Sequence, residues 1–186
     1  MKYLIIGLGN IGPEYELTRH NIGFLILDKL AHEKGVEFDH LKLANKTEFK
    51  HKGRTIHLIK PTTYMNLSGK SVNYWMQELK VDKANILVVM DDIALPYGNL
   101  RMRPKGSHAG HNGLRNIDEM IGGNDYTRLK FGVGNDFRPG QQADYVLSNF
   151  SKDEMIDLPL KMDKACEMIL SFCTLGTPKT MSQYND

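Results

Sequence analysis

The sequence is poor in cysteine and has no long apolar segment. Its 186 residues include two cysteines, Cys166 and Cys173, which lie seven positions apart in an apolar helical pattern. This spacing favours neither a disulfide framework nor a zinc site, so we expect both thiols to pack in the core. The apolar run KYLII is too short for a signal peptide or a membrane-spanning helix. We therefore expect a cytoplasmic protein.

Two common enzyme motifs are missing, and a third stands in the wrong context. The sequence has neither the G-x-S-x-G pattern of a serine hydrolase nor the G-x-x-x-x-G-K-[ST] pattern of a phosphate-binding loop. A G-x-G-x-x-G pattern does follow an apolar strand at 7–12, but Pro13, Glu14 and Glu16 come next, where a dinucleotide-binding helix would begin. The candidate for the ribose-binding acid, Asp28, falls inside a predicted helix. These features argue against a dinucleotide cofactor.

The composition is that of a globular protein with one unevenly charged stretch. Hydrophobic residues make up 41% of the chain, charged residues make up 25%, and the net charge is +2. These values and the length indicate one domain with a substantial core. Residues 99–116, however, carry four lysines or arginines, two histidines and no acidic residue. Such a stretch indicates either a solvated loop or a surface for a polyanionic partner.

Hydrophobic periodicity predicts six strands and four helices. We expect strands at 2–6, 46–51, 55–60, 86–90, 100–103 and 129–133, and helices at 22–34, 68–79, 113–121 and 152–175. The turn Lys52-Gly53-Arg54 predicts an antiparallel hairpin, and Pro159 is expected to interrupt or kink the last helix. Strands that alternate with helices predict a layered α/β fold with a mixed sheet, occupying 1–186 as one domain.

Polar side chains gather after several of the predicted strands. Because functional groups in such sheets lie beyond the carboxyl ends of the strands, we expect these side chains to share one site. They are Asn10 and the segment Thr18-Arg19-His20-Asn21, then Tyr64 and Asn66, then Asp91 and Asp92, and Asn112 in a nearby glycine-rich loop.

A histidine, an aspartate and several asparagines suit hydrolysis without a metal. A carboxylate holds a histidine in one tautomer and makes it a general base for water, and asparagine amides hydrogen-bond a carbonyl or oxyanion without titrating. Water could then attack an ester with no covalent intermediate. Two alternatives stay open. One is a metal site built from His108, His111 and the Asp91-Asp92 pair, which a flexible loop disfavours, and the other is a histidine with only a capping or surface role.

Four segments, in this order and spacing, resemble bacterial-type peptidyl-tRNA hydrolase. They are GLGNIGPEYELTRHNIGF, KPTTYMNLSG, DDIALPYG and GSHAGHNGL, and the similarity extends from Tyr3 to about Phe150. The resemblance implies a monomeric three-layer α/β/α domain with a twisted mixed sheet. It also implies a peptidyl-tRNA substrate, hydrolysed at the ester to the 3′ ribose without cofactor or metal. The alternative is an inactive RNA-binding relative on the same scaffold, which the joint presence of a base, its carboxylate and the amides disfavours.

The resemblance also implies roles for individual residues. His20 is the proton acceptor, Asp91 stabilises its charged ring, and Asn10 bonds near the first peptide unit of the substrate. Substrate-binding positions fall on Tyr15, Tyr64, Asn66 and Asn112. Contacts to the tRNA 5′ phosphate and acceptor stem fall on Arg103 and Lys105, with Arg128 and Lys130 as weaker candidates. The role of His111 stays open between orienting Asn112, touching the substrate and satisfying its own loop.

Overall fold

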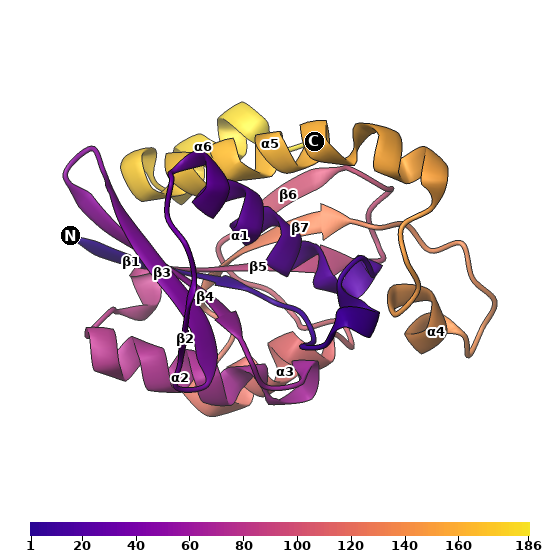
Figure 1. Cartoon of the computed structure of the whole chain (residues 1–186), viewed down its shortest axis with the longest axis horizontal. Coiled ribbons are helices and arrows are strands. Elements are labelled where there is room, and N and C mark those ends of the chain that lie inside the picture. The colour runs from indigo at the N-terminus through magenta and orange to yellow at the C-terminus, as the bar shows by residue number, and fades with distance from the viewer.

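The computed structural model describes residues 1–186, and they form a seven-stranded mixed sheet with helices on both faces (Figure 1). The strands are β1 (Lys2–Gly7), β2 (Asp39–Leu41), β3 (Ala44–His51), β4 (Arg54–Pro61), β5 (Ile86–Asp92), β6 (Leu100–Arg103) and β7 (Thr127–Gly132). The α-helices are α1 (Ile22–Glu33), α2 (Ser68–Leu79), α3 (Asn112–Ile121), α4 (Gln142–Val146), α5 (Lys152–Leu175) and α6 (Thr177–Tyr184). Short 3-10 helices are η1 (Pro13–Tyr15), η2 (Arg19–Asn21), η3 (Met65–Leu67) and η4 (Lys83–Asn85).

The centre of the sheet is parallel and its edges are antiparallel. The strand order is β2-β3-β4-β1-β5-β7-β6, in which β4, β1, β5 and β7 run parallel while β2, β3 and β6 pair antiparallel with their neighbours. The first six residues of β5 are buried, as expected for a central strand covered on both faces. The predicted mixed α/β sheet is therefore confirmed.

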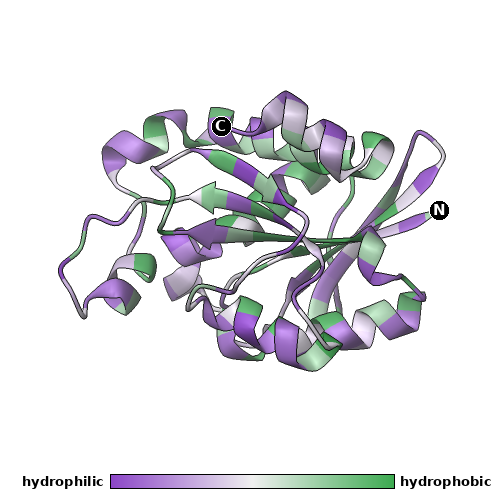
Figure 2. Ribbon diagram, turned by 180° about the vertical axis from the view of Figure 1, so that it is seen from behind, coloured by the Kyte–Doolittle hydropathy of each residue, from purple (hydrophilic) through white to green (hydrophobic).

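Alternate residues of the central strands feed two separate hydrophobic cores. Ile5 and Leu87 join the core under α1 and α5, whereas Leu4 and Val88 join the core under α2 and α3. This alternation is the two-residue period of a strand buried on both faces. Figure 1 shows α5 and α6 along one side of the sheet and α2 and α3 along the other, and Figure 2 shows apolar residues concentrated in the strands between them. The result is a three-layer α/β/α arrangement.

Two glycines bring the start of α1 into backbone contact with the sheet. A Cβ atom on Gly23 would lie 2.4 Å from the backbone nitrogen of Leu8 and 2.5 Å from the carbonyl oxygen of Val89. A Cβ atom on Gly7 would lie 2.4 Å from the carbonyl oxygen of Gly23. Both distances are far inside van der Waals contact, so only glycine fits at either position. The first glycine of the G-x-G-x-x-G pattern therefore serves close helix–strand packing, and this packing holds the residues just before α1 beside the end of β5.

All ten predicted elements occur, with ends that lie within two residues of the prediction. The hairpin is also confirmed, because His51 pairs with Arg54 and the turn residues Lys52 and Gly53 both have positive φ angles, of 48° and 79°. The sequence pattern did not reveal β2, α4 or α6, which are short or weakly periodic.

The expected effect of Pro159 was wrong in one respect. The α5 helix continues through Pro159 without interruption, from Lys152 to Leu175. Pro159 lies on the exposed side of the helix, where the carbonyl that loses its hydrogen-bond donor can meet water instead. None of the helices, this longest one included, is long and apolar enough to cross a membrane.

Candidate active site

A cavity of about 470 Å³ lies beyond the carboxyl ends of the central strands. Its wall is built from the loops after β1, β4 and β5, from the start of α3 and from α4. Six of the nine predicted site residues line it, namely Asn10, His20, Tyr64, Asn66, Asp91 and Asn112. The expectation that polar side chains from separate strand ends share one site is thus met by the structure.

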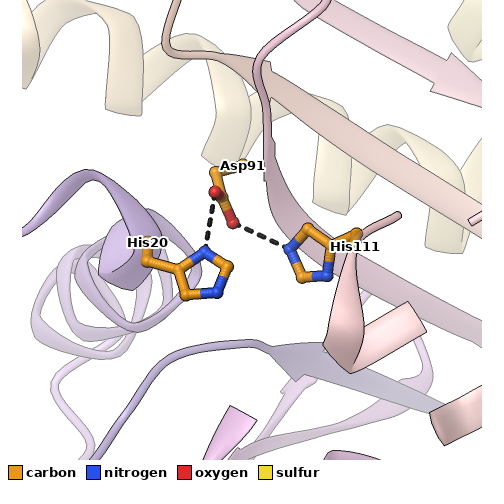
Figure 3. Close-up of side chains that lie close together, drawn as sticks. All are labelled: His20, Asp91 and His111. Carbon is orange, nitrogen blue, oxygen red and sulfur yellow. Dashed lines mark hydrogen bonds and ion pairs between the residues drawn. The ribbon is translucent and has the colours of Figure 1, made fainter. Parts of the chain in front are cut away.

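Asp91 lies at the centre of a three-residue cluster and binds a histidine through each carboxylate oxygen (Figure 3). It belongs to the last part of β5 and is only 2% exposed. Its Oδ2 lies 2.8 Å from Nδ1 of His20, and its Oδ1 lies 2.9 Å from Nε2 of His111. His20 comes from η2, ahead of α1, and His111 precedes α3, so the cluster joins three segments distant in sequence.

The two histidines differ in which ring nitrogens are in use. His111 caps α3: its Nδ1 accepts a hydrogen bond from the backbone N–H of Leu114 at 3.4 Å, so its Nε2 must carry the proton that faces Asp91. His20 uses Nδ1 toward Asp91, and no protein group binds its Nε2. Of the two, His20 has a basic nitrogen available to a ligand in the cavity.

Burial and charge act in opposite directions on His20. Burial disfavours the imidazolium and lowers its pKa, but the charge of Asp91 and the hydrogen bond to it outweigh burial, so the pKa of His20 is raised above its ordinary value of 6.5. Burial alone would raise the pKa of Asp91, yet the two facing histidines hold the pKa of that carboxyl well below its usual range. Asp91 is therefore ionised and favours a proton on His20.

Asn10 is oriented by hydrogen bonds on three of its groups. Its backbone N–H and C=O bind the side-chain amide of Asn21, at 2.8 and 2.9 Å. Its side-chain Oδ1 accepts from the backbone N–H of Met65 at 2.7 Å. Because Oδ1 is occupied, Nδ2 is the atom that Asn10 can offer to a ligand in the cavity. This arrangement makes Asn10 a fixed hydrogen-bond donor.

The remaining predicted substrate residues lie at the cavity rim. Tyr64 is 55% exposed, and Asn66 and Asn112 are also exposed. Tyr64 and Asn66 come from the turn that follows β4, and Asn112 is the first residue of α3. Side chains in this position are free to turn toward a bound substrate, unlike Asn10.

Three predicted residues lie outside the cavity lining. Tyr15 is the last residue of η1, Arg103 ends β6, and Lys105 is exposed in the loop that follows. Neither Arg103 nor Lys105 forms an ion pair with a protein carboxylate, so both charges are available to an anion. Arg103 and Lys105 therefore lie on the protein surface rather than in the cavity.

Of the two weaker tRNA candidates, one is excluded by burial. Arg128 has no exposed surface, and its guanidinium donates to the carbonyl oxygens of Gly106, Asn124 and Tyr126. The prediction that it contacts tRNA was therefore wrong, because the segments around Gly106 and Asn124 cover this side chain and accept its hydrogen bonds. Lys130, two residues on, lines the cavity 3.6 Å from Asp92.

Sequence reasoning placed Asn21 at the site without assigning it a role, and it missed several other residues that shape the site. Asn21 holds Asn10, Met65 packs under the cavity, and four residues in and after α4 form a wall: Gln142, Ala143, Val146 and Leu147. The position of Asn21 beside His20 offered a signal for the first. A helix as short as α4 gives none, because one turn cannot establish periodicity.

The cluster around Asp91 also has the composition of a metal site. His20, Asp91 and His111 place one ligand atom each within 4.8 Å of one another. Nitrogen and carboxylate donors of this kind suit several divalent metals. His108, which the sequence offered as a ligand, does not belong to this group, and its Nδ1 accepts a hydrogen bond from the backbone N–H of Gly110.

The side chains in the cavity indicate a class of protein, namely a hydrolase that acts on a carbonyl carbon. A histidine with one free nitrogen, a buried carboxylate behind it and a fixed amide donor form the apparatus by which enzymes activate water against a carbonyl carbon. Comparison with known proteins narrows this class to a family. The family model described as peptidyl-tRNA hydrolase matches residues 4–186.

Relatives and solved structures agree with that match over nearly the whole chain. Peptidyl-tRNA hydrolase of Cytophaga hutchinsonii is 57% identical over 185 residues, covering 100% of this chain and 98% of the relative. That of Porphyromonas gingivalis is 50% identical and is covered completely. A crystal structure of peptidyl-tRNA hydrolase from Acinetobacter baumannii, 30% identical, superimposes with a TM-score of 0.92 over 98% of this chain and 95% of that one. The chain belongs to the peptidyl-tRNA hydrolase family, as the four segments indicated.

Proposed function

We propose that this chain, acting as one domain over 1–186 and as a monomer in the cytoplasm, hydrolyses peptidyl-tRNA. The bond cleaved is the ester between the peptide and the 3′ ribose of the tRNA. One observation carries the proposal: His20 is held through Nδ1 by the buried Asp91 and has Nε2 free at a cavity lined with amide side chains. A metal or cofactor is not required by this arrangement.

In the proposed reaction His20 acts twice. Its Nε2 takes a proton from a water molecule as the water oxygen attacks the ester carbonyl carbon, and Asp91 stabilises the imidazolium that forms. The tetrahedral intermediate carries its negative charge on the former carbonyl oxygen. When the intermediate collapses, the bond to the ribose oxygen breaks and the imidazolium returns its proton to that oxygen. The products are a tRNA with an intact 3′ hydroxyl and a peptide carboxylic acid, which releases its proton to water and leaves as the carboxylate.

The amides supply hydrogen-bond donors for this sequence. Asn10 offers Nδ2 in a fixed position, which suits recognition of a peptide carbonyl near the ester. Asn66 and Asn112 lie at the rim, where either can donate to the oxyanion or hold the attacking water. His111 makes a different contribution, because both of its nitrogens are in use: it fixes Asp91 against the start of α3 and thereby places Asn112.

The tRNA is proposed to lie over the basic surface next to the cavity. Arg103 and Lys105 carry unpaired charges on the strand and loop leading from β6, and Lys130 lies at the cavity itself. Phosphate groups of the acceptor stem are the anions that such a surface attracts. Tyr64 offers aromatic surface at the cavity for the remainder of the substrate, and Tyr15 is proposed to contact it outside the cavity lining.

The deciding experiment measures release of tRNA from an N-blocked aminoacyl-tRNA, with and without a strong metal chelator. Unblocked aminoacyl-tRNA serves as the matched control substrate. We expect rapid hydrolysis of the blocked substrate, little hydrolysis of the control, and no effect of the chelator. Binding without cleavage would identify an inactive RNA-binding relative. Loss of activity in chelator, restored by a divalent metal, would assign the Asp91 cluster to a metal instead.

A further inference from the structure

The cavity wall formed by α4 lacks support of its own. The helix spans only Gln142–Val146, and within it Val146 alone is buried. A helix of this length is not stable in isolation and must be held by other parts of the molecule. Because Gln142, Ala143 and Val146 line the cavity, whatever holds α4 also determines the shape of the cavity.

Two side-chain attachments hold it: the hydroxyl of Tyr145 in α4 donates to the carbonyl oxygen of Val133 at 2.6 Å, and the guanidinium of Arg19, the residue just before His20, binds its C-terminal end. One terminal nitrogen of Arg19 donates to the hydroxyl of Ser148 and, at 2.9 Å, to the carbonyl oxygen of Asn149. The plane of the guanidinium covers the ring of Tyr145 in α4, with Cζ 4.3 Å from the ring centre. The side chain thus contacts both the helix and the segment that follows it.

The same guanidinium reaches the first turn of α5. Its other terminal nitrogen pairs with Oε1 of Glu154 at 3.0 Å, and this oxygen also accepts the backbone N–H of Ser151 in the capping box of α5. Backbone contacts run parallel to these: the N–H of Arg19 donates to the carbonyl oxygen of Ser148 at 3.0 Å. One residue therefore connects η2 to the end of α4, to the segment that follows it and to the start of α5.

Arginine is specifically suited to this position. Arg19 is 9% exposed, and a buried cation is tolerated only with a counter-charge and hydrogen-bond acceptors, which Glu154, Ser148 and Asn149 provide. A planar fork can serve separate acceptors and stack on Tyr145 at the same time, whereas a lysine ammonium is a single point charge. Arg19 itself lies outside the cavity lining, so its effect must pass through its neighbours.

We propose that Arg19 is a positioning residue that fixes the α4 wall relative to His20 and so determines how tightly the substrate is held. The proposal rests on the proposed function for its kinetic consequence. Its structural consequence is independent of any substrate: without the guanidinium, α4 and the residues up to 149 keep the backbone hydrogen bonds to residues 17–19 but lose their side-chain attachment to η2. His20 keeps its own bond to Asp91, which Arg19 does not touch.

The test compares Arg19→Gln and Arg19→Lys with the wild type and with Arg54→Gln as a matched control. Arg54 also donates to backbone carbonyls, those of Lys52 and Thr174, but it lies at the start of β4, far from α4 along the sheet. Amide hydrogen exchange is measured over 142–150 and over β5. Hydrolysis of N-blocked aminoacyl-tRNA is measured as kcat and KM across pH.

We expect Arg19→Gln to accelerate exchange over 142–150 but not over β5. We also expect it to raise KM about tenfold while kcat changes less, because the charge-assisted hydrogen bonds of the guanidinium hold a binding wall and not the reacting groups. The pH profile keeps its wild-type midpoint. For Arg19→Lys we expect an exchange rate over 142–150 and a KM between those of the wild type and Arg19→Gln. Arg54→Gln should match the wild type in both. A loss confined to kcat with a displaced pH profile would overturn the proposal and show that Arg19 holds His20 instead.

A second variant tests the proposal if Arg19→Gln does not fold. Glu154→Gln removes the counter-charge but keeps an acceptor for the capping box, and we expect the same pattern at smaller amplitude. Unchanged exchange over 142–150 in a folded variant would overturn the proposal even if the chain proved to have another activity. If instead the proposed function is wrong, the wild type will not hydrolyse N-blocked aminoacyl-tRNA, but replacing Arg19 will still accelerate amide hydrogen exchange over 142–150.

Discussion

Two histidines of this molecule, the largely buried His20 and the buried His57, lie beside carboxylates, and yet their pKa values are shifted in opposite directions. His57, in β4, is 5% exposed, and its Nδ1 lies 3.6 Å from Oε1 of Glu48. Burial, reinforced by the charge of Lys46, lowers the pKa of His57 to about 4. His20 is also mostly buried, but its pKa is raised.

The difference lies in the carboxylate and in what else binds it. The carboxylate of Glu48 pairs with Lys46 at 3.0 Å, and its side chain is 54% exposed. Water and the lysine charge therefore weaken the electrostatic effect of Glu48 on the pKa of His57. Asp91 is 2% exposed, and the groups that face its oxygens are His20 and His111. A charge in a low-dielectric setting acts more strongly on its neighbour. Burial of a histidine therefore does not identify a base, whereas a buried carboxylate beside it that pairs with no lysine or arginine does.

Replacing His20 is the sharpest way to test this comparison. We expect His20→Ala to reduce kcat for N-blocked aminoacyl-tRNA by about 10²–10⁴-fold, the usual contribution of a general base. His57→Gln, the matched buried histidine, should leave kcat and KM unchanged. Circular dichroism and thermal melting establish that both variants fold. Near-normal hydrolysis by folded His20→Ala would mean that another group activates the water.

Removing the carboxylate tests the cause of the raised pKa. In the wild type we expect activity to increase with pH through a midpoint above 6.5, because His20 must lose its proton to act and Asp91 favours the protonated form. Asp91→Asn removes the charge, so the midpoint should move to lower pH. The rate at high pH should fall by less than in His20→Ala, about 10–10²-fold.

The pH–rate profile of each variant supplies the measurement. A midpoint that stays in place would show that Asp91 does not set the pKa of His20. A loss equal to or larger than that in His20→Ala would give Asp91 a direct part in the reaction.

The basic surface outside the cavity should contribute a smaller and salt-dependent effect. We expect replacing Arg103 and Lys105 together with glutamine to weaken tRNA binding at low salt and to lower the slope of log K against log salt by about one for each phosphate that is no longer neutralised. Lys83→Gln is the control, since Lys83 is paired with Asp125 and lies away from the cavity. Equal slopes for the double variant and the wild type would place the phosphate-binding groups elsewhere.

The sequence predicted the framework of the fold because its strands and helices are long and regular. The β5 run ILVVM could only be a central strand, and the polar residues that follow it fell at the site for that reason. The inward direction of Arg128 was not predictable, since a charged residue in a strand normally indicates an exposed face and only the acceptors of other segments make its burial tolerable. The contact of His111 with Asp91 and the wall formed by α4 likewise depend on how loops meet in three dimensions.

His57 itself provides the smallest predicted effect, in stability rather than activity. In the folded protein His57 stays neutral down to a pH of about 4, whereas in the unfolded chain it takes up a proton near 6.5. Between these values the unfolded state binds more protons, so the free energy of unfolding decreases as pH falls. His57→Gln removes this titration, and we expect the wild-type slope in that window to become shallower by less than about 1 kcal/mol per pH unit. Urea unfolding at several pH values measures this slope of the free energy of unfolding. His32→Gln, at an exposed histidine, is the control. A slope that His57→Gln leaves unchanged would show that His57 is protonated in the folded state, and the contrast with His20 would then fail.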